Sequence, residues 1–219
     1  MQIIQGLCYH IFVSNKGKQI TEIQSLIEYQ ERVLNPYYWI DQADELIQAS
    51  KKLEPSIKKY WLTTSKYFDP IKGTYNPPPG FKPKKLLQST YFLLVAYAIE
   101  NYFKAIMITE FDAKYRDEIF RTGKLPEALK GHNLTSLARR AKFSLNDIEI
   151  ALLTRVYRNS IWQGRYPVPV NVDQLNSMAV YNGKTFFTAF LAPADINNLN
   201  TLIRRIKKLS LNKFSAPEK

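Results

Sequence analysis

Residues 150–169 read IALLTRVYRNSIWQGRYPVP, and the stretch changes from a regular apolar pattern to an abrupt stop. Its apolar side chains recur at helical spacing, which predicts an amphipathic helix. A glycine and two prolines in the last six residues then end any helix. Arg155, Arg158 and Asn159 fall on the later turns, and Arg165 follows at the stop. Polar groups crowded at the end of an apolar helix are the sharpest chemical feature of the chain.

A second stretch, residues 86–111, is apolar on nearly all sides and predicts a central, buried helix. Within it Glu100 and Lys104 lie one turn apart in the favourable acidic-first order, so the two side chains can pair on one face. An isolated buried carboxylate is costly, and we therefore expect Glu100 to have a partner. The pattern favours a structural ion pair over a catalytic role.

The segments on the N-terminal side predict further helices. Residues 21–34 and 39–53 carry apolar side chains at helical spacing, and Pro55 can open a third helix. Residues 69–85 hold five prolines and two glycines, which excludes a helix or a central strand there. We expect three parts: an N-terminal helical extension packed on the bundle (1–68), a proline-rich connector (69–85) and a helical domain with a C-terminal hairpin and helix (86–219).

Between the two apolar stretches the sequence carries several helix boundaries. Residues 112–128 are polar and mixed and predict a short helix ending at Thr122-Gly123. Asn133 or Thr135 can cap the next short helix, because both side chains accept hydrogen bonds from free backbone amides. Residues 144–147, SLND, are another start signal, and they open the helix of the 150–169 stretch.

The C-terminal part predicts a hairpin and a last helix. Asn182-Gly183 is a turn dipeptide between residues 177–181 and 184–190. Pro193 opens a helix with a clean apolar stripe and cations in its last turns. We therefore expect an all-α bundle of about five to seven helices with one small β-hairpin. Residues 3–13 add a short N-terminal strand or a buried extended segment.

Composition points to an anionic partner without naming it. The formal charge is +12 and the isoelectric point is near 9.6, which favours RNA or DNA over a membrane. A merely basic protein without such a partner is the alternative. The lone cysteine, Cys8, excludes an internal disulfide and fits a reducing cytoplasm. We expect no signal peptide, because no basic leader precedes the first apolar run, and no membrane span, because the longest apolar run, residues 91–99, is too short.

Motifs for several reaction classes are absent from the sequence. It contains no glycine-rich phosphate loop, no GxSxG, no HExxH and no paired cysteines. Only His10 and His132 are histidines, and they lie far apart in the sequence, so a zinc site is not expected. We accordingly expect no cofactor and no metal.

Three segments resemble the HEPN superfamily, small helical domains of prokaryotic defence and toxin systems. AIENYFKAIMI is similar to the family's buried helix with an acidic residue and a lysine four positions later. GHNLTSLARRA is similar to its Gly-His loop before the next helix, and RVYRNSIWQGRYPVP to the late helix with the arginine motif. The resemblance covers roughly residues 86–170. It implies a helical fold, frequent homodimers and, in active members, metal-independent RNA cleavage.

The resemblance also shows a departure at the catalytic motif. In active members a histidine follows the arginine by four to six residues, commonly with a polar residue beside the arginine. Arg158 and Asn159 match the start, but residues 163–165 are Gln-Gly-Arg and no histidine follows His132. RNA cleavage through the 2′-hydroxyl needs a group that exchanges protons near neutral pH, as imidazole does and glutamine does not. The candidates for an atypical catalytic site are Arg158, Asn159, Glu100 and His132.

The same region offers groups for binding RNA without cleavage. Guanidinium groups bind phosphate and aromatic rings stack on bases. The nucleic-acid-binding candidates are Arg158, Arg165, Tyr166, Trp162, Lys104, Arg139 and Arg140. Alternatively, Trp162 and Tyr166 fill the core while the arginines cap carbonyls at the helix end. The basic cluster at residues 204–208 reads as a solvated face or, less favoured, as a phosphate contact.

These observations lead to three expectations for function. The first is a catalytically degenerate HEPN-like protein that binds RNA or a protein partner in a defence or toxin–antitoxin setting. The second is a metal-independent ribonuclease with an atypical site. The third is a dimeric scaffold that binds only protein. We expect a cytoplasmic homodimer in each case.

Overall fold

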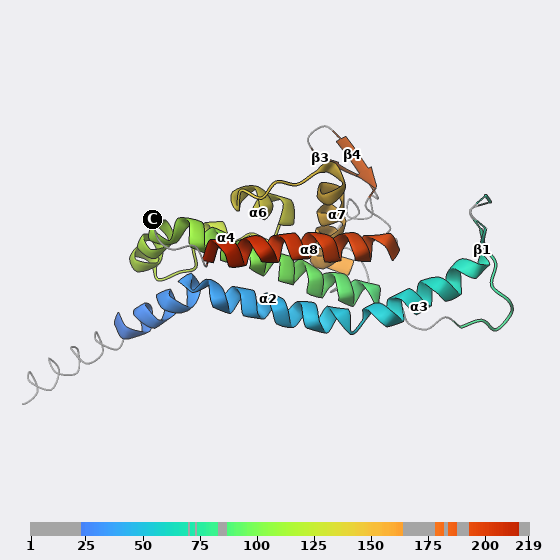
Figure 1. The fold of residues 1–219 in the computed structure, drawn as a ribbon, viewed down its shortest axis with the longest axis horizontal. Coiled ribbons are helices and arrows are strands. Elements are labelled where there is room, and N and C mark those ends of the chain that lie inside the picture. The colour runs from blue at the N-terminus through green and yellow to red at the C-terminus, as the bar shows by residue number, and fades with distance from the viewer. Residues whose placement is uncertain are drawn as a thin grey trace, which may run out of the picture.

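The computed structural model describes residues 23–69, 71–72, 74–82, 87–163, 178–181, 184–187 and 193–214. Over these residues the fold is mostly helical, and the predicted helical fold with a small hairpin is confirmed. In Figure 1 the other long helices lie around a central helix, α4 (Gln88–Thr122). Those packed against it are α2 (Pro36–Lys51), α6 (Leu134–Arg140), α7 (Asp147–Arg158) and α8 (Pro193–Phe214).

Helix α4 forms the centre of the fold. It runs for 35 residues and is kinked at Phe111, where φ is −128° and ψ is 27°. The buried helix was predicted to end at residue 111, but it is only kinked there. It continues to Thr122 and ends at Gly123, which adopts the left-handed conformation with a φ of 65°. By length and composition α4 could cross a membrane, but 72% of its most apolar window is buried inside the protein. Such burial is typical of a core helix that neighbouring helices cover.

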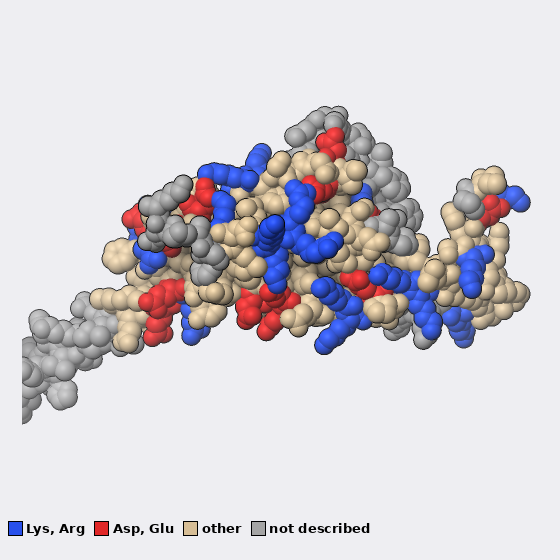
Figure 2. Space-filling model, viewed as in Figure 1, with Lys and Arg blue, Asp and Glu red and all other residues tan. Residues whose placement is uncertain are grey.

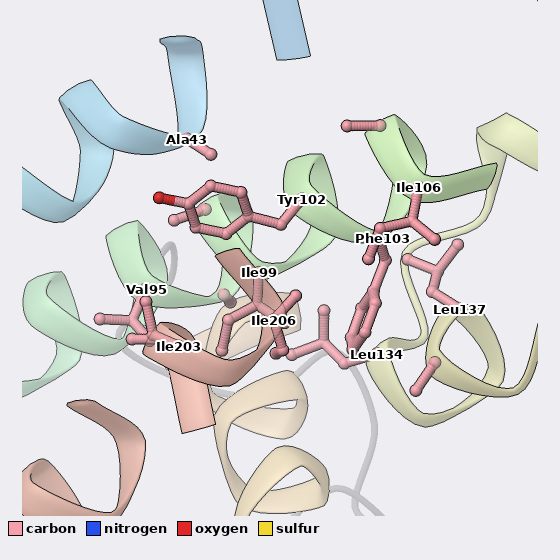
Figure 3. Packing of buried hydrophobic residues seen from close by; sticks show 14 of the residues in the cluster. Ala43, Val95, Ile99, Tyr102, Phe103, Ile106, Leu134, Leu137, Ile203 and Ile206 are labelled. Atoms are coloured by element: carbon pink, nitrogen blue, oxygen red, sulfur yellow. The ribbon is translucent and has the colours of Figure 1, made fainter. Parts of the chain in front are cut away.

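The core joins α4 to the helices around it (Figure 3). Tyr102 and Phe103 of α4 are fully buried, and Leu134 of α6 and Ile206 of α8 are at most 1% exposed. Tyr102 points from α4 toward Ala43 of α2. The described helices therefore share one contiguous apolar core rather than packing as separate clusters.

The N-terminal helices begin at prolines, as the sequence indicates. Residues 23–34 are helical, and Asn35 then caps α2 by accepting a hydrogen bond from the Tyr37 amide at 3.0 Å. Pro36 occupies the first turn, where its missing amide hydrogen costs nothing. Helix α3 (Glu54–Thr64) likewise has a proline in its first turn. The prediction of a helix over 39–53 was right in kind and two to three residues late at its ends.

Side-chain caps fix the start of the next helices. The short helix α5 (Glu127–Lys130), which the sequence did not predict, precedes the loop at His132. Of the two caps considered for α6, Asn133 is the one used, because its Oδ1 accepts from the Ser136 amide at 2.9 Å. Asn146 and Glu149 form a reciprocal capping box at the start of α7, in the predicted SLND segment.

The strands form two small hairpins. β3 (Met178–Tyr181) pairs antiparallel with β4 (Lys184–Phe187), as predicted around Asn182-Gly183, which itself lies outside the described residues. A second hairpin, β1 (Phe68–Asp69) with β2 (Thr74–Tyr75), follows the 3-10 turn η1 (Ser65–Tyr67) and was not predicted. The expected N-terminal strand at residues 3–13 lies outside the described residues. The three-part division of the chain stays a prediction.

Candidate functional site

The predicted arginine motif lies where α7 changes into a π-helix, η2 (Asn159–Gln163). Arg158 is the last residue of α7 and is half-buried, whereas Asn159 and Ser160 are only 4% and 6% exposed. The Ser160 hydroxyl donates to the Tyr157 carbonyl at 2.7 Å. η2 packs against α4. A π-turn is rare and is often found at functional sites, so this polar junction is a candidate site by geometry as well as by motif.

The rest of the motif is described only in part. The backbone of Trp162 lies in η2, but its side chain, like the whole of Arg165 and Tyr166, lies outside the described residues. Their proposed contacts with phosphate and bases therefore stay predictions.

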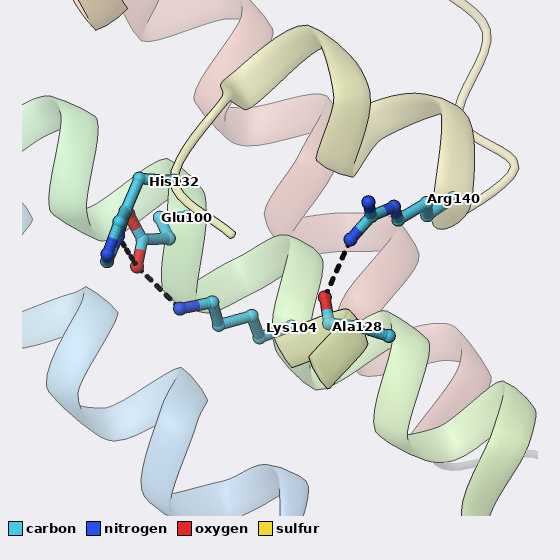
Figure 4. Close-up of polar contacts among 5 residues, drawn as sticks. All are labelled: Glu100, Lys104, Ala128, His132 and Arg140. Atoms are coloured by element: carbon cyan, nitrogen blue, oxygen red, sulfur yellow. Dashed lines mark hydrogen bonds and ion pairs between the residues drawn. The ribbon is translucent and has the colours of Figure 1, made fainter. Parts of the chain in front are cut away.

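Glu100 and Lys104 of α4 form a polar cluster with His132 of the loop before α6, which we call the polar cluster on α4 (Figure 4). The Lys104 ammonium donates to Glu100 Oε1 at 2.5 Å, and the two residues are 4% and 7% exposed. His132 Nδ1 is 3.0 Å from both carboxylate oxygens of Glu100. The Lys104 ammonium also lies 5.5 Å from the centroid of the Trp39 ring. The ion pair expected one turn apart is present, and Glu100 has two partners rather than one.

This arrangement fixes the orientation of His132. A carboxylate only accepts, so Nδ1 is the donor and the imidazole is held from one side. The His132 side chain is 62% exposed, which leaves its other nitrogen accessible. A base oriented by a carboxylate is the geometry of general-base catalysis. The structure thus joins two of the four catalytic candidates, Glu100 and His132. The other two, Arg158 and Asn159, lie where α7 meets η2, which also packs on α4.

The remaining predicted RNA contacts differ in accessibility. Arg139 and Arg140 are exposed at the end of α6, and Arg140 Nη1 donates to the Ala128 carbonyl at 3.0 Å (Figure 4). Lys104, by contrast, is buried with its ammonium on Glu100. A phosphate reaching Lys104 would have to break a buried ion pair, which is strongly unfavourable. Lys104 is therefore unsuited to a phosphate contact, contrary to the prediction from sequence.

A basic pocket that the sequence did not predict lies between α2, α4 and α8. Its volume is about 330 Å³, and its charged lining consists of Lys51, Arg204, Lys207 and Asp44. Lys207 donates to both carboxylate oxygens of Asp44 at 2.7 Å, which neutralises that carboxylate. Lys51 and Arg204 are exposed, and together they leave two unbalanced positive charges at one opening. Such a pocket suits an anion.

Tyr102 of α4 forms part of the wall of this pocket. Its hydroxyl donates to Asp44 Oδ1, and it lines the same pocket. Burial, followed by the hydrogen bond to Asp44, raises the pKa of Tyr102 above the usual value of 10. The hydroxyl therefore stays protonated as a donor, and with Lys207 it holds Asp44 in place.

Further exposed cations lie on α3, on α8 and directly after α2. Figure 2 shows Lys and Arg gathered over α8 and over the junction of α2 and α3. We call the exposed residues Lys51, Lys52, Lys59, Arg204 and Lys208 the basic surface. None of the four lysines in it has an ion-pair partner among the described residues, whereas Arg204 donates to the Asn200 carbonyl at 3.2 Å. The sequence shows these residues as two basic runs about 150 positions apart but not that α3 and α2 meet α8.

The alternatives to the basic surface would be a second pocket with charged walls or a metal site. A pocket of about 510 Å³ at residues 28–38 holds two carboxylates and two arginines, Glu28, Glu31, Arg32 and Arg116, so its charges balance. Within the part of the chain that the structure describes, no group of three or more His, Cys, Asp or Glu side chains is placed to hold a metal ion. The basic surface is thus the described site with the clearest charge preference.

Comparison with known proteins adds no assignment. No family model matches the chain, and neither a curated protein nor a solved structure matches it. The resemblance to HEPN domains rests on the three quoted segments and stays a prediction.

Proposed function

We propose that this chain is a catalytically degenerate HEPN-like protein that binds RNA through the basic surface. The observation that carries the proposal is the pocket where Lys51 and Arg204 face an opening with one carboxylate, already neutralised by Lys207. Backbone phosphates supply the regularly spaced negative charge that such a surface attracts. The half-buried Arg158 and the exposed Arg139 stay secondary candidates for contact.

The absence of cleavage is part of the proposal. The three positions where active members carry the motif histidine hold Gln163, Gly164 and Arg165, none of which exchanges a proton near neutral pH. His132 contacts Glu100 instead and so ties the loop before α6 to α4. We keep the defence or toxin–antitoxin setting, a cytoplasmic location and a homodimer as what the resemblance implies.

The test measures binding and cleavage of a labelled single-stranded RNA in EDTA. The variant Lys51→Glu with Arg204→Glu is compared with Lys114→Glu with Lys124→Glu, which changes charge equally at the other end of α4. We expect the first variant to bind at least about tenfold more weakly and to lower the salt slope by roughly 1.4, at about 0.7 for each lost contact. Equal losses in both variants would show only a general charge effect and would refute the proposed surface.

A second candidate function has one specific observation in its favour. Glu100 orients His132, and the imidazole is largely exposed, so a metal-independent ribonuclease with an atypical base is chemically sensible. Cleavage of the same RNA in EDTA, lost on His132→Gln and on Arg158→Ala, would establish that enzyme. Binding without cleavage supports the degenerate protein. If neither is seen while the chain sediments as a dimer, the scaffold is favoured.

A further inference from the structure

An aromatic pocket lies where α3 ends and β1, β2 and the start of α4 come together. Its volume is about 470 Å³, and most of its lining is aromatic: Tyr60, Trp61, Phe68 and Tyr75. Figure 1 shows α3 leading away from the bundle to this hairpin, so the pocket lies at one end of the molecule. It has no part in the polar cluster on α4 or in the pocket between α2 and α8.

The walls of this pocket are held in place by specific contacts. Phe68 and Tyr75 are opposite each other in the β1–β2 ladder, so their side chains emerge on the same face. On the helical side the rings of Tyr60 and Trp61 meet edge to face, with centroids 6.0 Å apart. Asp69 Oδ1 accepts from the Ile71 and Lys72 amides at 2.9 and 3.2 Å and fixes the turn between the strands.

The rings are exposed where core rings would be buried. Phe68 is 51% exposed and Tyr75 is 44% exposed, whereas Tyr91 and Phe92, in the following helix α4, are at most 1% exposed. Because neither ring is fully buried, the protein loses much of the stabilisation that an aromatic side chain contributes to folding. Exposed rings on both sides of one opening are an arrangement that accepts another flat ring between or against them.

A polar group at the floor also lacks a partner. Gln88 lines the pocket, and its side-chain oxygen is buried with no hydrogen-bond partner among the described residues. A buried unsatisfied amide is costly. A carboxamide offers both a donor and an acceptor, which is what recognition of a nucleobase edge uses.

The charge around the pocket is positive. Lys66 and Lys72 flank the lining residues in the sequence and are exposed, and neither forms an ion pair within the described ranges. The carboxylate of Asp69 is occupied by the turn amides. Lys59 of the basic surface precedes Tyr60 on α3, and Figure 2 shows further Lys and Arg along α3. An apolar peptide would gain nothing from these lysines, whereas a nucleic acid strand would.

We propose that the aromatic pocket takes an unpaired nucleobase of a single-stranded nucleic acid whose phosphates follow the basic surface. The inference rests on the proposed function and deepens it, because stacking requires a base that is free of a partner strand. Stacking platforms beside a cationic track are the common device of single-strand binders. Duplex RNA, whose bases are stacked inside, would meet only the cations.

The test uses Phe68→Ala with Tyr75→Ala, and Phe120→Ala as the matched control, since Phe120 is 73% exposed near the far end of α4. Both exposed rings can be removed with little loss of packing, and a thermal melt checks folding. Binding is measured to single-stranded RNA, to the same RNA with abasic sites, to single-stranded DNA and to duplex RNA.

We expect the double variant to bind single-stranded RNA and DNA about tenfold more weakly, with an unchanged salt slope. Abasic RNA, which keeps its phosphates, should bind both proteins equally. The single variant Tyr75→Phe should bind like the wild type, because it keeps the ring.

The proposed base-binding role of the pocket is refuted if the double variant binds single-stranded RNA as tightly as the wild type does. It is also refuted if the double variant loses as much affinity for abasic RNA as for intact RNA. If Lys51→Glu with Arg204→Glu still weakens binding in that case, the proposed function stands. A wild-type protein that retains none of the four nucleic acids refutes both.

Discussion

The polar cluster on α4 predicts a specific pattern of stability changes. Glu100→Gln leaves the Lys104 ammonium, 4% exposed, without its carboxylate. Breaking a buried ion pair by removing one partner costs about 3–5 kcal/mol, because the other charge stays buried. For a chain of this size that corresponds to a fall in Tm of about 6–20 °C.

The double variant Glu100→Gln with Lys104→Met separates the ion pair from the space that it fills. Methionine keeps the unbranched shape of the lysine side chain, and glutamine keeps the shape of glutamate. Replacing a buried pair by uncharged groups of similar volume is often close to neutral, so we expect stability within about 1 kcal/mol of the wild type. The coupling between the two positions should then exceed about 2 kcal/mol.

Urea unfolding of the wild type, Glu100→Gln, Lys104→Met and the double variant measures the cycle, with His132→Gln as a fifth protein. Because the His132 side chain is 62% exposed, its removal should cost less than about 1 kcal/mol. Additive losses at positions 100 and 104, or a Glu100→Gln variant as stable as the wild type, would refute the structural role.

Three further predictions concern residues outside the cluster. Hydrogen bonds from Lys142 and Lys213 lower the pKa of Glu110 from 4.5 to about 2. Its contribution, roughly 1 kcal/mol after screening at the exposed Lys142, is present above pH 4.5 and lost as pH falls toward 2. Urea unfolding of wild type and Glu110→Gln should therefore differ at pH 7 and converge in acid; a constant difference would contradict this. Asn146→Ala removes the capping box of α7 and should cost about 1 kcal/mol by the same assay, whereas a loss near zero would mean that the cap is idle. Gly123→Ala should lower Tm by a few degrees because of its φ of 65°, and an unchanged Tm would refute that reason.

Local chemistry in the sequence was sufficient to predict most helix boundaries. Asn133 and Asn146 cap the helices that follow them because their side chains reach the backbone amide three residues away. Gly123 ends α4 because it adopts the left-handed conformation at no steric cost. These signals act within one turn, so a single sequence contains them in full.

The β1–β2 hairpin and the π-turn η2 were missed for different reasons. Proline density was a correct argument against long elements, but the prolines at residues 77–79 follow the two-residue strands rather than lying in them. A two-residue ladder needs no periodic pattern, so none was visible. The π-turn at Asn159 inserts one residue into a helix, and no residue type marks that insertion.

Contacts between distant segments were beyond the reach of local patterns. The pairing of Glu100 with Lys104 was predictable because one helical turn separates them. The contact of His132 with the same carboxylate was not, because it depends on how the loop after α5 returns to α4. Asp44 and Lys207 are 163 positions apart, and only the packing of α8 on α2 brings them together.

The positive charges differ in whether they meet a carboxylate among the described residues. Lys104 and Arg155 have largely buried side chains and each meets a carboxylate, as buried cations must. The half-exposed Lys207 also pairs with a carboxylate, that of Asp44. The lysines of the basic surface meet none among the described residues, although a helix face can easily place glutamate one turn away from lysine. Their mutual repulsion is a cost that folding alone does not repay. A polyanion would relieve that repulsion on binding, so its affinity should fall steeply as salt rises, and the loss on Lys51→Glu should shrink in parallel.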